Sequence, residues 1–237
     1  MIWLFAALLI IWGNLMPPLI GTSARLPGGS WSFVLAGAAL VLVSMAAARA
    51  FSLDAQALGL EWHSAARGAI IGALPAALIA GAAVAIFAAA PVIIGRPVSY
   101  APLRDMPADA LARHVAFFLP LGAVIPEEVA FRGALLGALL RRAGARAAVA
   151  WSAAAFAMWH GSVVFATVAD TTLGPPSALF VPAVFGFVVV LLAGGALMAI
   201  VRLATGSLAS TIAAHWVFNA VILLGLWRAA LPPAPLA

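Results

Sequence analysis

The sequence contains no cysteine among its 237 residues. A disulfide, a thiolate metal site and a cysteine nucleophile are therefore excluded. Lysine is also absent, and only 8% of the residues are charged, against about a quarter in soluble domains. The arginines are scattered among the connecting segments and form no basic stripe with interleaved aromatic residues. This pattern excludes nucleic-acid binding and favours contacts with membrane lipid.

The sequence has long apolar runs instead. Hydrophobic residues make up 66% of the chain, and the mean hydropathy is +1.17. Roughly 20 apolar helical residues cross a bilayer, and the runs lack the alternation of β-barrel strands. The prediction is an all-α fold, a polytopic transmembrane bundle of about seven to eight helices. The runs cover about 1–20, 31–48, 68–90, 111–140, 147–168, 178–203 and 207–228.

Two segments near the N-terminus allow more than one interpretation. The chain is uncharged up to Arg25 and lacks the positive region of a signal peptide, which favours a retained first helix over a cleaved signal. Residues 53–67 carry charged side chains between leucines and alanines. That segment is predicted either as an amphipathic helix at the membrane interface or as a solvated connector.

Two adjacent glutamates, Glu127 and Glu128, lie within one of the most apolar runs. A carboxylate at the centre of a membrane helix costs about 2.5–3.5 kcal/mol on insertion scales, so intramembrane ionisable residues are functional by default. Arg132 shares a helix face with Glu128 and can pair with it. Glu127 points about 100° away and is free to act as a general base. Pro126 is expected to begin a new helical segment, with both glutamates in its first turn.

Two histidines in equally apolar surroundings form the other candidate motifs. Phe156 and His160 are four residues apart and line one face of the fifth run, and His215 and Asn219 have the same spacing in the last run. The alternative for each motif is a structural hydrogen bond between helices. Between these motifs, Gly206 is predicted to close one helix in a left-handed conformation and Ser207 to cap the next.

These motifs together resemble those of the CPBP family, also called Abi, which comprises CAAX prenyl proteases and bacteriocin-processing enzymes of the Rce1-like type. The resemblance rests on PEEVAFRG at 126–133, FxxxH at 156–160, TGSL at 205–208 and HxxxN at 215–219. It implies an intramembrane protease with its catalytic core in residues 111–228. Residues 1–110 are then N-terminal transmembrane helices with the interfacial connector, and 229–237 a C-terminal tail.

The resemblance also implies a role for each residue. Glu127 is expected to activate a water, with His160 holding that water. His215 and Asn219 are expected to stabilise the oxyanion. Glu128, Arg132 and Phe156 are expected to contact the catalytic side chains and orient them. The same chemistry with zinc held by Glu127, His160 and His215 is the alternative. The zincin spacing HExxH is absent, and Asn219 suits an oxyanion hole better than zinc, so no cofactor is expected.

Other classes of function stay open at this stage. Buried Glu and His also mark proton-coupled transporters, although the two halves show no inverted repeat. A non-catalytic membrane partner or immunity protein is a further alternative. The favoured prediction is an endopeptidase that acts on membrane-associated or lipidated peptides. The composition, rich in alanine and arginine, suggests a bacterial plasma membrane.

Overall fold

The computed structural model describes residues 1–20, 30–61 and 65–230. It is built from helices, with no strand in these described ranges beyond an isolated bridge between Tyr100 and Thr171. His63 of the predicted connector and most of the predicted tail at 229–237 lie outside the described residues.

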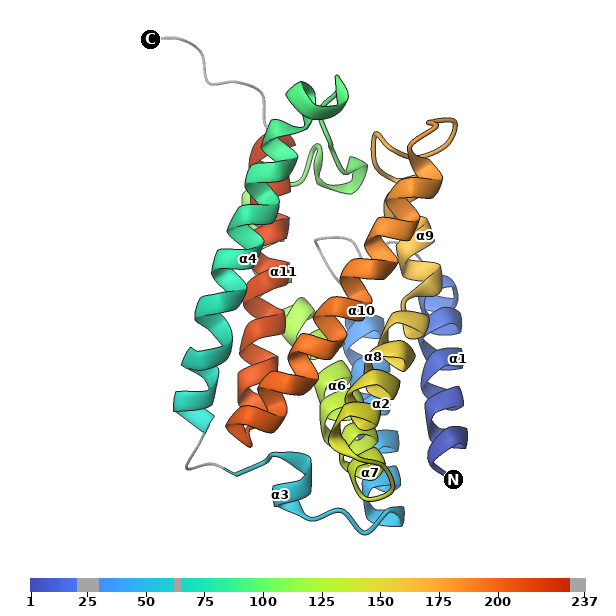
Figure 1. Cartoon of the computed structure of the whole chain (residues 1–237). Helices are drawn as coiled ribbons and strands as arrows, with labels where there is room; N and C mark the ends of the chain where they lie inside the picture. Colours follow the sequence, from blue (N-terminus) through green and yellow to red (C-terminus); the bar gives the residue numbers. More distant parts are fainter. Residues whose placement is uncertain (21–29, 62–64, 231–237) are drawn as a thin grey trace.

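The described residues form a series of helices along the chain (Figure 1). Helical segments suit lipid because they satisfy every backbone polar group internally. The α-helices are α1 (Ile2–Ile20), α2 (Trp31–Ala50), α3 (Ala55–Leu58), α4 (Ala65–Ile94), α5 (Ala108–Arg113), α6 (Ile125–Glu128), α7 (Leu136–Leu140), α8 (Ala145–Trp159), α9 (Gly161–Ala169), α10 (Phe180–Thr205) and α11 (Leu208–Ala230).

Within the described ranges, six helices are long and apolar enough to cross a membrane, and a seventh span results if α8 and α9 are taken together. The predicted all-α membrane bundle is thus confirmed. α4 packs along α11, α10 packs on α8, and α1 lies beside α8 and α9 (Figure 1). The segment predicted at 53–67 is not one amphipathic helix, because α3 ends at Leu58 and α4 already begins at Ala65.

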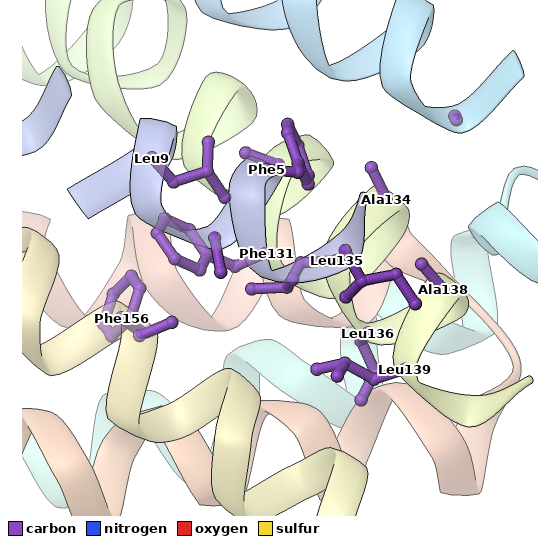
Figure 2. Close-up of a cluster of buried hydrophobic side chains, with 14 of the residues drawn as sticks. Phe5, Leu9, Phe131, Ala134, Leu135, Leu136, Ala138, Leu139 and Phe156 are labelled. Atoms are coloured by element: carbon purple, nitrogen blue, oxygen red, sulfur yellow. The ribbon is translucent and has the colours of Figure 1, made fainter. Parts of the chain in front are cut away.

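The main apolar core lies where α1, α2, α8 and the segment Val129–Leu140 meet. Figure 2 shows Phe5 and Leu9 of α1 facing Phe131 and Phe156. The Phe131 ring meets the Phe156 ring edge-on at 5.2 Å and the Trp159 ring at 5.5 Å between centroids. These aromatic contacts fix α8 against the helix that carries the glutamates.

The prediction that a helix begins at Pro126 is wrong. The span Ala108–Leu140 is continuous, and it includes π-helical segments at His114–Phe118, Pro120–Val124 and Val129–Leu135. Ile125, just before Pro126, keeps right-handed helical angles. The wider π turns lie on both sides of the proline, and π-bulges are frequent at functional sites. Glu127 and Glu128 therefore lie in the middle of a span.

The fifth run is not a single straight span either. α8 and α9 meet at an angle of 49°, and His160 is the residue at the break. Its φ of −89° and ψ of 5° lie outside the helical range. The predicted catalytic histidine therefore projects from a broken helix rather than from the smooth face of a continuous one.

The turn between α10 and α11 matches only half of the prediction. Gly206 closes α10 with φ 67°, as expected, and its N–H donates to the Arg202 carbonyl at 3.0 Å. Ser207 does not cap α11, because its buried hydroxyl has no hydrogen-bond partner among the described residues. Instead, the Ser207 N–H donates to the Thr205 hydroxyl at 3.3 Å.

Candidate active site

The two glutamates lie side by side in α6 but face different partners. Glu128 is completely buried, whereas Glu127 keeps 9% of its surface exposed. The His160 ring approaches Glu127, and the Arg132 and His215 side chains approach Glu128. The two carboxylates therefore point in different directions, as adjacent positions on a helix do.

Glu128 joins two cationic or ionisable side chains through one oxygen. Its Oε1 accepts from Arg132 Nη1 at 3.2 Å, and the side chains of this pair are fully buried. The same oxygen lies 2.9 Å from His215 Nδ1. The predicted pair of Glu128 and Arg132 is present, and the bond to His215 adds a link from α6 to α11.

Phe156 is the ring around which the ionisable side chains are arranged. The Arg132 guanidinium lies over it at 4.0 Å from the ring centroid, within the range of a cation–π contact. The His160 ring is 4.5 Å away and the His215 ring 6.1 Å away, both edge-on. Phe156 thus lies between three polar side chains, and the orienting role expected of it stays a prediction.

His160 is oriented by its own helix and directed at Glu127. Its Nδ1 lies 2.8 Å from the Phe156 carbonyl oxygen, one turn back. Because a carbonyl only accepts, Nδ1 carries a proton and donates it. The other nitrogen, Nε2, lies 3.6 Å from Glu127 Oε2, which has no hydrogen-bond partner among the described residues. The pair offers a small molecule one acceptor oxygen and one ring nitrogen.

Asn219 follows His215 by one turn of α11. It is partly buried, whereas His215 is buried with 8% of its surface exposed. The i,i+4 spacing puts both side chains on one helix face. Because His215 uses Nδ1 for Glu128, its Nε2 is the ring atom left to meet a ligand.

As placed, the three residues considered for zinc do not form a metal site. Zinc needs ligand atoms converging at about 2.0–2.2 Å from one point. Over the described ranges, no three Asp, Glu or His side chains are grouped so that they could hold a metal ion. His215 presents Nδ1 to Glu128, and Glu127 has His160 as its near partner.

Sequence reasoning found the charged and imidazole side chains of this cluster but did not find all of its contacts. The pair of Glu128 and Arg132 follows from spacing alone. The bond between His215 and Glu128 joins positions 87 residues apart, and no local pattern indicates it. The sequence did give one indication of such a bond. Glu128 is a second carboxylate in an apolar run, and a buried charge needs polar partners.

Residues 110–221 match the family model described as type II CAAX prenyl endopeptidase Rce1-like. The match spans Glu127, His160, His215 and Asn219, together with Glu128, Arg132 and Phe156. It confirms the resemblance that the motifs indicate. No curated protein and no solved structure matches the chain.

Proposed function

We propose, from the membership of residues 110–221 in the Rce1-like family of type II CAAX prenyl endopeptidases, that this membrane protein hydrolyses peptide bonds with Glu127 as the general base. The family supports an intramembrane endopeptidase. The observation that carries the finer proposal is the approach of His160 Nε2, at 3.6 Å, to Glu127 Oε2, an oxygen with no hydrogen-bond partner among the described residues.

In the first step, Glu127 removes a proton from a water that His160 holds through Nε2. The hydroxide attacks the carbonyl carbon of the scissile bond, and the carbonyl oxygen becomes an oxyanion. Glu127, now a carboxylic acid, then passes the proton to the leaving nitrogen as the carbon–nitrogen bond breaks. Atoms and charges balance, and the carboxylate is restored for the next turnover.

His215 and Asn219 are the proposed donors to the oxyanion. Asn219 donates from its amide nitrogen. His215 already uses Nδ1 toward Glu128, so donation from Nε2 requires a ring protonated on both nitrogens. The Glu128 carboxylate, which His215 shares with Arg132, favours that positive charge, and a charge-assisted donor binds an oxyanion more strongly than a neutral one.

The proposed substrate is a peptide segment of a membrane-associated or lipidated protein. Glu127 and His160 are nearly enclosed, with 11% and 14% of their side chains exposed. They lie in segments whose composition suits the membrane, and we expect the substrate to reach them from the bilayer. We place the protein in a bacterial plasma membrane, on the composition of the chain.

The alternative is a zinc-dependent version of the same reaction. The arrangement of Glu127, His160 and His215 gives it no support, because these side chains do not converge on one point. A non-catalytic partner or a transporter is disfavoured by the family match, which describes endopeptidases.

The experiment is peptide cleavage by the purified protein in lipid vesicles. A quenched fluorescent peptide with a prenylated CAAX terminus is compared with the same peptide lacking the prenyl group. Glu127→Gln, His160→Gln and His215→Gln are each expected to abolish cleavage while the protein remains folded. His114→Gln is the matched control, since His114 is also buried and lies in the same long span as the glutamates. Near-wild-type turnover in any of the three site variants would remove that residue from the mechanism.

A further inference from the structure

The break at His160 contains a side chain from the far N-terminus of the chain. Asn14 lies in α1, which packs against both α8 and α9 (Figure 1). Its Nδ2 donates to the Met158 carbonyl at 2.8 Å, and its Oδ1 accepts from the Ser162 N–H at 2.8 Å. These two contacts lie on opposite sides of His160.

The two backbone groups are those that a continuous helix would join. In an α-helix, the N–H of residue 162 donates to the carbonyl of residue 158. Here the Asn14 amide lies between them and bonds to each, so one side chain replaces one bond of the helix ladder. A side chain inserted into the ladder is one of the recognised causes of a kink, and the kink here is 49°.

The surrounding residues are shaped to admit this amide. A Cβ on Gly161 would lie 2.8 Å from Asn14 Oδ1, and a Cβ on Gly13 would lie 2.4 Å from the Trp159 carbonyl oxygen. The remaining amide proton of Asn14 is used as well, because Nδ2 also lies 2.8 Å from the Ile10 carbonyl. Every donor of this amide is therefore engaged.

We infer that Asn14 is a positioning residue for catalysis, which holds the break between α8 and α9 open and thereby aims His160 at Glu127. The inference rests on the role proposed for His160. Asn14 lies outside the matched segment 110–221, so the family motifs do not assign it any role. It acts through the backbone on either side of His160 and touches no reacting atom.

The test compares three variants in vesicles with the peptide substrate described above. Asn14→Leu keeps the side-chain shape and loses both hydrogen bonds. Asn14→Asp keeps an acceptor for the Ser162 N–H but loses the donor to Met158. Ser162→Ala is the matched control at the same helix crossing: it removes only the Ser162 hydroxyl, which lies 3.4 Å from the Gly13 carbonyl, and keeps the backbone N–H.

Asn14→Leu is expected to lower kcat by about 10²-fold, the cost of misplacing a catalytic group by about 1 Å, with KM nearly unchanged. Asn14→Asp is expected to lose activity as well, because its carboxylate would face the Met158 and Ile10 carbonyl oxygens with no proton to donate, whereas Ser162→Ala is expected to lose none. A wild-type kcat in Asn14→Leu would overturn the inference. If Asn14→Leu does not fold, a wild-type kcat in Asn14→Asp overturns it equally.

The geometry of the break is measured separately from activity. Because the chain has no cysteine, spin labels can be attached at Ala147→Cys and Asp170→Cys, two exposed positions on either side of the break. In Asn14→Leu the label-to-label distance should lengthen and its distribution broaden as α8 and α9 straighten, with Ser162→Ala unchanged. A distance unaltered in Asn14→Leu would contradict the inference even if kcat fell. If His160→Gln instead remained fully active, the proposed function would fail, while the label distances would still report on the break.

Discussion

At the scale of single residues, the two adjacent carboxylates of the site, Glu127 and Glu128, have different surroundings. Glu128 is buried and bonded to Arg132 and His215, so its carboxylate orients these two side chains. Glu127 has an oxygen without a partner among the described residues. Two neighbours of identical chemistry thus acquire different proposed roles from the direction in which each one points.

Asn219 provides a graded test of the proposed oxyanion hole. Asn219→Ala is expected to reduce kcat by about 10²–10³-fold and to leave a measurable rate, because one of two donors remains. Single-turnover cleavage in vesicles measures it, with the rate of His215→Ala expected to fall further because that change also removes the bond between α11 and Glu128. An unchanged kcat in Asn219→Ala would mean that this amide does not face the oxyanion.

The residues of the site were predictable from the sequence because carboxylates and imidazoles are conspicuous in an apolar chain. Spacing also predicted the pair of Glu128 and Arg132, since i,i+4 partners are neighbours on any helix. The bond of Glu128 to His215 was not predictable in this way, because it depends on how α11 packs against α6. The absence of a metal cofactor stays a prediction.

At the scale of elements, the ion pair of Glu128 and Arg132 connects the glutamates to the packing of the bundle. Arg132 lies over Phe156 of α8, and its Nη2 lies 3.5 Å from the Gly195 carbonyl of α10. One arginine thus touches two helices besides its own.

Arg132→Ala is therefore expected to lower both activity and stability. Removing one member of a buried pair leaves the other charge uncompensated, at a cost of about 3–5 kcal/mol. Thermal unfolding in detergent micelles measures the change. Arg113→Ala is the matched control, because it breaks a pair of the same i,i+4 spacing in which both side chains are more than half exposed, and such pairs contribute about 0–1 kcal/mol. Lost activity with an unchanged melting temperature would indicate that Arg132 contacts the substrate directly.

The elements show where local reasoning fails. The membrane spans were predicted correctly because the length of each apolar run determines whether a helix can cross the bilayer. The break at His160 was not predicted, because Asn14 is more than 140 positions away from its partners there. A helix start was predicted at Pro126, but the structure has none there. The helix continues through this proline, with π-helical segments on both sides of it.

At the scale of the whole molecule, the N-terminal helices and the matched segment form one unit. α1 and α2 contribute to the same apolar core as Phe131 and Phe156, and α1 supplies the amide at the break. The boundary predicted near residue 110 separates the segment that carries the motifs from the preceding helices, and the core crosses that boundary. The N-terminal helices thus support the geometry of the site as well as adding membrane spans.

The central claim is that Glu127 activates water without the help of a metal ion. The measurement that tests it most directly is kcat for metal-free protein, with bound zinc determined on the same sample, for the wild-type chain and Glu127→Gln side by side. The account predicts full activity of the wild-type chain without bound metal and no detectable turnover by Glu127→Gln at an unchanged melting temperature. Stoichiometric zinc, with activity lost on chelation and restored by zinc alone, would contradict it.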